Sequence, residues 1–408
     1  MKIKELFNRY NDSFLILLVV LSVFLKITGG IYFIRPIINL AYPALLITTL
    51  LYNFSIITKK SSIYKPILFF LLYLMVNVIV CSPDEVFRPW QRFFFLCILL
   101  AVVSPLFQNN KMRQFRKNAL QIACIISSFY AVMSFFFYFL GINMMSIEKD
   151  MEILEEYEGV GGWFSGLLAH SMLLGPVAAI ASCYLLYLYL QQRKLYLLIL
   201  LIACLGALLF ASSRGAIIAT IASFLYVFYR LYKIDKKANR NFLYLFIFLF
   251  VTFPIWDSAL DGIRFKENRG DASGTYGSRT RKFEQRINEI ESNPFIGIGF
   301  SSISQRRQIT RSGAVEPGSS WLATLSMTGI IGFIFVVSFF RTGFRIKTKV
   351  DSNLLTKSLL IFWSVHMIVE GYIYAAGSSL CFLVWLVVGV SIDERIKEKR
   401  AHRLSVYQ

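Results

Sequence analysis

Residues 195–232 read LYLLILLIACLGALLFASSRGAIIATIASFLYVFYRLY, two apolar stretches separated by Ser212, Ser213, Arg214 and Gly215. As one helix, this segment would be about 57 Å long at roughly 1.5 Å per residue, well beyond the roughly 30 Å hydrocarbon core of a bilayer. An arginine at the centre of a membrane helix also costs roughly 2.5 to 3.5 kcal/mol. The segment therefore predicts two transmembrane helices joined by a turn at 212–215, with Arg214 at the membrane surface.

Comparable apolar segments recur along the whole chain. Hydrophobic residues make up 56% of the 408 residues, and 38 residues are Phe. Soluble domains have a lower fraction of apolar residues. Since about 20 apolar residues span a bilayer, we expect an all-α polytopic membrane protein in which residues 1–408 form a single membrane domain. The twelve predicted passes lie near residues 13–28, 32–57, 64–81, 90–107, 117–141, 166–190, 195–211, 215–232, 241–256, 319–340, 354–372 and 376–392.

The charges in the loops predict the orientation of these passes, because cytoplasmic loops are enriched in Lys and Arg. The intervening loops are poor in charge or acidic, as in Asp84-Glu85 and the run from Glu148 to Glu158. Both termini are therefore expected in the cytoplasm and the two long loops outside. The net charge of +19 reflects this bias and attraction to anionic lipid, so nucleic acid is not an expected partner. The basic loops contain Lys2, Lys4, Arg9, Lys59, Lys60, Lys65, Lys111, Arg113, Arg116, Lys117, Arg193, Lys194, Lys233, Lys236, Lys237, Arg240, Arg341, Arg345, Lys347, Lys349 and residues 395–403.

The long outer loop at 257–318 differs from the rest of the chain. Apolar residues at helical spacing in 281–292 (Phe283, Ile287 and Ile290) predict an amphipathic helix on the membrane surface. Asn293-Pro294 is expected to end this helix, because the residue before a proline is disfavoured in the α region. The following Phe295–Phe300 contains two glycines and is expected to turn or to pack closely. Without a preceding strand, Gly-x-Gly does not predict a nucleotide site.

Arginines are unusually frequent on the expected outer side, where the positive-inside bias predicts few. An anionic ligand outside the membrane would explain the excess, and the cost of Arg214 favours a functional role for it. A single loop arginine such as Arg306 is more simply explained as an interfacial side chain or an ion-pair partner. The outer set comprises Arg35, Arg88, Arg92, Arg214, Arg264, Arg269, Arg279, Arg281, Arg286, Arg306, Arg307 and Arg311.

The six cysteines are scattered through apolar segments without paired spacing. They are expected to pack as small hydrophobic residues, with no disulfide or metal framework. No motif in the chain predicts a bound cofactor.

Three motifs follow one another in the second half of the chain. They are Ser212–Ala216, then Ser278-Arg279 ahead of Asn293–Gly299, then Ser320–Leu325 leading into Thr328–Gly332. In this order and spacing the chain resembles the O-antigen ligase and polymerase superfamily over about 195–390, whereas its first half resembles the family in hydropathy alone.

The resemblance implies a GT-C-like glycosyltransferase in the bacterial cytoplasmic membrane, which needs neither metal nor nucleotide sugar. Its expected partners are glycans linked to undecaprenyl pyrophosphate, as donor and as acceptor, membrane lipid, and a possible chain-length regulator. By this resemblance Arg214 and Arg279 grip the pyrophosphate, which agrees with the affinity of a guanidinium fork for phosphate oxygens. Further contacts to the substrate are expected from Arg88, Arg92, Arg281 and Arg286.

The chain departs from the ligase pattern at one place. Ligases carry a His-Asn pair where this chain has Gly318 and Ser319. This difference favours a polymerase of O-antigen, capsule or exopolysaccharide, whose acceptor hydroxyl needs an activating group. The candidate bases are Glu316, Glu158 and His170. His170 is also explained as a hydrogen-bonded interfacial residue, and Glu158 as part of a solvated loop.

Other residues and functions stay open at this stage. Glu370 is expected near the outer end of the eleventh pass, where it either orients an arginine or binds the acceptor. Outer aromatics (Trp90, Trp163, Tyr276 and Trp321) either stack on sugars or form an interfacial belt. The alternative functions are a ligase that transfers glycan to lipid A core or protein, and a transporter of the lipid-linked oligosaccharide. A transporter is expected to carry its charges near the bilayer midplane, whereas these gather at one face.

Overall fold

The computed structural model describes residues 2–144, 164–232, 277–304, 318–346 and 350–406. These residues form a helical bundle with one short two-stranded antiparallel sheet. The elements are α1 (Lys2–Leu25), η1 (Tyr32–Ile34), α2 (Arg35–Tyr52), α3 (Phe54–Lys60), β1 (Ser62–Ile63), α4 (Lys65–Cys81), η2 (Glu85–Phe87), α5 (Pro89–Val103), β2 (Phe107–Gln108), α6 (Asn110–Phe139), α8 (Ser171–Gln192), α9 (Leu195–Phe210), α10 (Arg214–Tyr232), α13 (Gly277–Ser292), α14 (Ser320–Phe344), α15 (Val350–Val369) and α16 (Ser379–Val406).

Each predicted pass contains a helix, except for 241–256, which lies outside the described residues. The all-α class is therefore confirmed, but the number of twelve passes is not. Among the described residues, five helices are long and apolar enough to cross a membrane, or six if the bent pair α2 and α3 is one span. Others are shorter, such as α9, whose 16 residues extend for about 24 Å.

The outer surface of the bundle carries large apolar side chains. Ile79, Phe94, Ile199 and Ile218 are each at least half exposed, on four different helices. Such patches are rare on soluble monomers and are normal where a protein faces lipid. Together with the apolar helices, they indicate an integral membrane protein.

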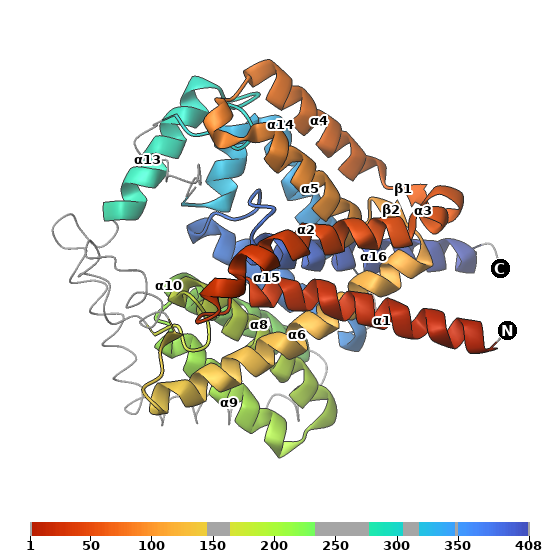
Figure 1. Cartoon of the computed structure of the whole chain (residues 1–408), viewed down its shortest axis with the longest axis vertical. Helices are drawn as coiled ribbons and strands as arrows, with labels where there is room; N and C mark the ends of the chain where they lie inside the picture. The colour runs from red at the N-terminus through yellow and green to blue at the C-terminus, as the bar shows by residue number, and fades with distance from the viewer. Residues whose placement is uncertain (1, 145–163, 233–276, 305–317, 347–349, 407–408) are drawn as a thin grey trace.

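The helices pack so that distant segments meet. Helix α8 packs on α6 and α9, α10 packs on α15, and α14 packs on α13, α15 and α16. Both chain termini lie on one side of the bundle with α3, β1 and β2, while α13 lies on the other side (Figure 1). We call the latter side the loop end, and it also holds the starts of α8, α10 and α14 and the end of α15.

A buried ion pair joins α6 to α16 far from the loop end. Arg116 donates from Nε and Nη2 to the two carboxylate oxygens of Asp393, at 2.7 and 3.1 Å. Both side chains are almost completely buried. Buried pairs of this kind are costly to break because the remaining charge is left unpaired.

Candidate functional site

The turn between α9 and α10 lies slightly earlier than the sequence predicted. Ala211–Ser213 form it, with Ser212 at a positive φ of 50° and its amide N donating to the Leu209 carbonyl at 2.8 Å. Arg214 and Gly215 are not part of the turn but the first two residues of α10. The half-buried Arg214 thus stands at the helix N-terminus on the loop end.

Two glycines allow the start of α10 to approach its neighbours. A Cβ atom at Gly215 would collide with Cγ2 of Val369 in α15, and one at Gly175 in α8 would lie 2.6 Å from Cβ of Ser213. Gly215 therefore serves close helix packing rather than the turn that the sequence predicted. These contacts hold Arg214 between the start of α8 and the end of α15.

The start of α14 is tied to the end of α15. Ser319 caps α14 by accepting from the Leu322 amide at 3.3 Å, and its Oγ donates to the Met367 carbonyl at 3.2 Å. The amide N and Oγ of Ser320 both donate to the Glu370 carbonyl, at 2.9 and 2.7 Å. Glu370 follows directly after α15, as the sequence predicted. In this contact it accepts hydrogen bonds through its main-chain carbonyl.

A small cavity lies beside this junction. We call it the Ser320 cavity; its lining includes Arg92 of α5, Ser301, Ser320 and Tyr372. Arg92 donates from Nη1 to Oγ of Ser301 at 2.8 Å, although the two are 209 positions apart. The Tyr372 amide donates to Oγ of Ser320 at 3.0 Å. Sequence reasoning found Arg92 but missed Ser301 and Tyr372, whose proximity depends on tertiary packing.

The Asn293–Gly299 motif docks on a break in α14. Gly329 has a φ of 60° and a ψ of −171°, so the helix ladder is interrupted there. The amides of Ile298 and Gly299 donate to the freed carbonyls of Ser326 and Met327, at 2.8 and 3.1 Å, and the Ile330 amide donates to the Pro294 carbonyl at 2.9 Å. The motifs Asn293–Gly299 and Thr328–Gly332 therefore contact each other through their main chains.

Helix α4 holds this docked segment from its other side. The fully buried Asn77 donates to the Ile296 carbonyl and accepts from the Phe300 amide, both at 2.7 Å. Tyr73 donates from its hydroxyl to the Thr328 carbonyl at 2.5 Å. The prediction that Phe295–Phe300 turns or packs closely is thus confirmed, and Ser301 is brought to Arg92 as a result.

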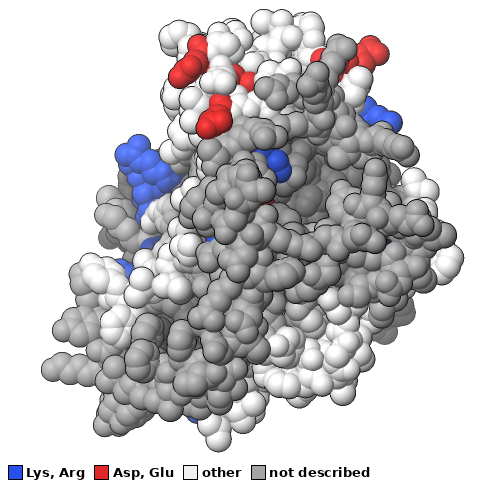
Figure 2. Space-filling view, turned by 90° about the vertical axis from the view of Figure 1, so that its left-hand side faces the viewer, with Lys and Arg blue, Asp and Glu red and all other residues white. Residues whose placement is uncertain are grey.

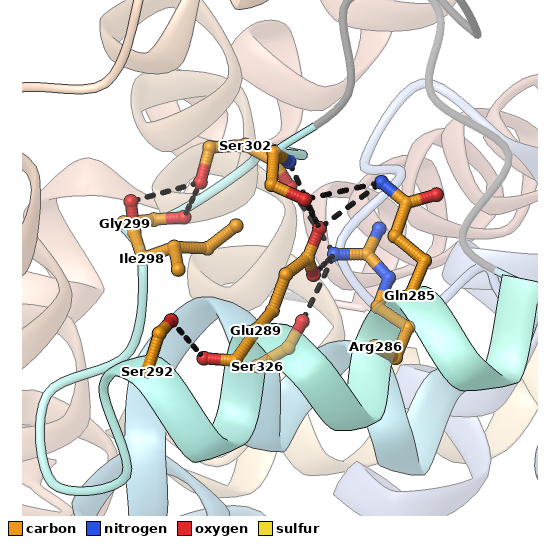
Figure 3. A network of polar contacts seen from close by, with 9 residues as sticks. Gln285, Arg286, Glu289, Ser292, Ile298, Gly299, Ser302 and Ser326 are labelled. Carbon is orange, nitrogen blue, oxygen red and sulfur yellow. Dashed lines mark hydrogen bonds and ion pairs between the residues drawn. The ribbon is translucent and has the colours of Figure 1, made fainter.

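Helix α13 lies where the sequence predicted a helix, beginning four residues earlier at Gly277 and ending before Asn293. It packs on the protein through polar side chains, with Gln285, Arg286 and Glu289 all buried, whereas Ile287 is 46% exposed. Arg286 donates from Nη1 to Glu289 at 2.7 Å and to Oγ of Ser326 at 2.9 Å (Figure 3). Of the three apolar residues of α13, Phe283 and Ile290 are partly buried and Ile287 is exposed.

The buried pair on α13 is tightly satisfied on the carboxylate side. Glu289 accepts from the amide and hydroxyl of Ser304, both at 2.8 Å. It also accepts from Gln285 at 3.2 Å (Figure 3). Burial lowers the pKa of the Arg286 guanidinium, and the adjacent Glu289 opposes this shift. Arg286 was predicted to contact substrate, but these contacts favour a role in holding α13 on α14.

One comparison identifies part of this assembly. Residues 199–337 match the family model Wzy_C, described as O-antigen ligase. We call this matched stretch the Wzy_C segment. No curated protein matches the chain. The predicted resemblance to the O-antigen ligase and polymerase superfamily is therefore confirmed, and the Wzy_C segment contains Arg214, α13, the docked motif and the break at Gly329.

The Wzy_C segment does not form the site by itself. The Ser320 cavity is also lined by Arg92 and Tyr372, and Ser320 itself is bonded to the carbonyl of Glu370. These three residues lie outside the matched range. The predicted candidates Glu158 and Glu316 lie outside the described residues, and for Arg279 and Arg281 the structure describes the helical backbone of α13 but not the side chains. Among the described residues, no group of three or more His, Cys, Asp or Glu side chains is placed to hold a metal ion.

His170 stands just before α8, at the loop end. Its Nδ1 accepts from the Met172 amide at 3.0 Å and so caps the helix. A nitrogen that accepts from an amide carries no proton, which places the proton of the neutral ring on Nε2. His170 would lose this cap by taking up a proton at Nδ1, so the contact favours the structural role over that of a base.

The face at the loop end carries charges of both signs. Figure 2 shows lysine and arginine side chains at several places on this face and acidic side chains towards the top of the view. Arg88 lies at the start of α5, exposed and with a positive φ of 49°. Its neighbour Trp90 is 42% exposed and stacks on Phe94, as expected of an aromatic side chain at a membrane interface.

Proposed function

We propose that this chain is a polysaccharide polymerase that joins glycan repeat units linked to undecaprenyl pyrophosphate, on the outer face of the bacterial cytoplasmic membrane. The observation that carries the proposal is the position of Arg214 within the Wzy_C segment. Arg214 begins α10, next to the point where the start of α14 is bonded to the end of α15. Both termini would then face the cytoplasm, as the basic loops indicate. A chain-length regulator is a possible further partner.

The electrostatics of the loop end suit a pyrophosphate. Helices α8, α10 and α14 begin here, and none has an acidic residue in its first turn. Free amides and the helix dipole make a helix N-terminus attractive to anions. Arg214 adds a permanent charge and a bidentate donor at one of these termini. Arg279, carried on α13, is the proposed second donor.

The proposed reaction is a displacement at the anomeric carbon of the donor glycan. A hydroxyl oxygen of the acceptor glycan forms a bond to this carbon, and the bond between the carbon and the pyrophosphate oxygen breaks. Undecaprenyl pyrophosphate leaves with the electron pair, and the hydroxyl proton passes to a base, for which Glu316 is the proposed residue. Arg214 and Arg279 would stabilise the charge that develops on the leaving pyrophosphate.

A polymerase is favoured over a ligase by the two residues that replace the ligase His-Asn pair. Gly318 has a positive φ of 73°, and Ser319 caps α14, so both positions serve the backbone at the start of this helix. Neither supplies a base. The ligase remains the second candidate because the Wzy_C description names that activity.

The test is a reconstitution of the purified protein with lipid-linked repeat units alone. A ladder of longer products supports the polymerase. Product that forms only after a separate acceptor is added would replace this proposal with a ligase. Absence of any product, with transfer of the intact lipid-linked glycan across the membrane, would replace it with a transporter.

A further inference from the structure

We propose that Arg88 and Arg92 bind the pyrophosphate of a second lipid-linked glycan, the acceptor of the polymerase reaction. This inference rests on the proposed function. It assigns a ligand class to the α4–α5 edge of the loop end, apart from the donor arginines Arg214 and Arg279.

The two arginines place like charges next to each other at the start of α5. They are one helical turn apart, with the Arg92 amide donating to the Arg88 carbonyl at 3.1 Å. Like charges at this spacing destabilise a helix. Arg88 in addition has a left-handed backbone, which non-glycine residues adopt at a cost and which is often found at functional sites. An anion bound at the start of α5 would offset the repulsion and would also suit the helix dipole.

Each arginine lines a different hollow on the same turn of α5. Arg92 faces the Ser320 cavity. Arg88 lines an open groove, which we call the Arg88 groove, together with Ser82, Glu85, Trp90 and Gln91. Arg88 supplies phosphate donors, whereas Ser82, Gln91 and the Glu85 carboxylate suit sugar hydroxyls away from the phosphate. The exposed indole of Trp90 suits the apolar face of a sugar. The chemistry of the groove thus matches a phosphorylated glycan.

The surroundings of the groove indicate that this ligand is lipid-linked. The Arg88 groove includes Ile79, which is 55% exposed, and the nearby Val80 and Phe94 are 61% and 58% exposed. Apolar side chains this exposed on membrane helices face acyl chains. A polyprenyl chain can therefore stay in the bilayer along α4 and α5 while its pyrophosphate reaches Arg88.

The position of the groove fits an acceptor. From Arg92 the Ser320 cavity leads to Ser320, whose hydroxyl donates to the Glu370 carbonyl. Glu370 follows Val369, which contacts Gly215 next to Arg214. A continuous set of contacts therefore connects the cavity at Arg92 with the start of α10 at Arg214. A polymerase joins two lipid-linked glycans and needs a pyrophosphate site on each side of the reacting sugars, whereas a ligase needs one.

The experiment counts bound lipids. Purified full-length protein in phosphatidylcholine nanodiscs is titrated with undecaprenyl pyrophosphate, and native mass spectrometry measures the bound copies. Wild type should bind two copies. Arg88→Asn should weaken one of them at least about tenfold, as expected for loss of a charge-assisted contact, while asparagine tolerates the left-handed backbone. Arg214→Ala should weaken the other copy.

Arg193 offers a matched control. It also has a positive φ, of 53°, and an exposed side chain, but it follows α8 at the far end of that helix from the loop end. Arg193→Asn should keep both copies. Arg92→Lys, which keeps the charge but not the fork, should weaken the same copy as Arg88→Asn by a smaller factor.

Three results would overturn the inference: one copy bound to wild type, two undiminished copies on Arg88→Asn, or displacement of the second copy by an equal amount of phosphatidylglycerol. The last would make the groove an ordinary phospholipid headgroup site. Failure of the proposed function looks different, because a protein that binds two copies but makes no ladder from repeat units keeps the site and loses the polymerase. A ladder with an unchanged count on Arg88→Asn keeps the polymerase and removes the site.

Discussion

Gly329 of α14 lies directly against the main-chain carbonyl of Phe295, so closely that a Cβ atom at position 329 would collide with the carbonyl carbon and oxygen. This contact joins two motifs more than thirty positions apart and fixes where α13 lies on the bundle. It also brings Ser301 to Arg92 at the cavity. Gly297 and Gly329 are explained by this backbone docking, since a Cβ atom at either position would collide with main-chain atoms of the other motif.

Gly329→Ala should therefore be far more damaging than an ordinary glycine substitution. The change combines backbone strain at positive φ with displacement of the docked segment, and we expect a loss of at least about 3 kcal/mol in the free energy of unfolding. Gly141→Ala is the matched control, because Gly141 has a similar φ of 69° with no atom within 4 Å of an added Cβ. That variant should lose about 1 kcal/mol. Unfolding in detergent measures both, and equal losses would contradict the docking account.

The buried pair on α13 should respond unequally to the loss of its two members. Glu289 keeps donors from Ser304 and Gln285 when Arg286 is removed, whereas Arg286 keeps hydroxyl and carbonyl partners but no carboxylate among the described residues when Glu289 is removed. We expect Glu289→Ala to lose about 3 to 5 kcal/mol of stability and Arg286→Ala less.

The double variant of Arg286 and Glu289 should recover part of the loss, because neither charge is left unpaired. A double-mutant cycle in unfolding experiments measures this coupling. Losses that simply add would show that the pair does not act as a unit. The comparison is the buried pair of Arg116 and Asp393, which lies far from the loop end. Arg116→Ala and Asp393→Ala show how much stability is lost when a buried pair is broken there.

The sequence predicted the helices well because membrane passes are encoded locally, in runs of about 20 apolar residues. Residues 195–232 form two helices as expected, and 281–292 form a helix. Arg214 was found because a charge inside an apolar run is costly and therefore noticeable.

The sequence did not predict how α13 packs or why α14 breaks. The apolar spacing around Ile287 indicated a helix, but the most buried side chains of that helix are the polar ones around Arg286, whereas Ile287 itself is exposed. The break at Gly329 depends on hydrogen bonds with Pro294, Ile298 and Gly299. Such long-range pairings leave no periodic signal in one sequence.

The stability of the protein should depend on pH through Glu394, which lies in α16 beyond the predicted pass. Burial raises the pKa of Glu394 to about 7, from an ordinary value of 4.5. The folded state thus binds the proton more tightly than the unfolded state, so stability is highest below 4.5, falls between 4.5 and about 7, and is level above. The expected fall in the free energy of unfolding is about 3 kcal/mol. Glu394→Gln should remove this slope in unfolding measured from pH 4.5 to 8, and an unchanged slope would assign it to another group.

Arg214 and Arg279, which we call the donor clamp, should bind the pyrophosphate through both donors of each guanidinium group. We expect Arg214→Ala and Arg279→Ala each to reduce polymer formation by roughly 10²-fold or more, since each removes stabilisation of the leaving pyrophosphate. The lysine variants should recover activity partly, because lysine restores the charge but not the two parallel donors. Product ladders on gels measure the effect, with membrane insertion verified for each variant. Arg193→Ala, a change at the far end of α8 from Arg214, should give a normal ladder. Normal chain length in the Arg214 or Arg279 alanine variant would remove that arginine from the clamp, and full recovery by lysine would show that charge alone matters there.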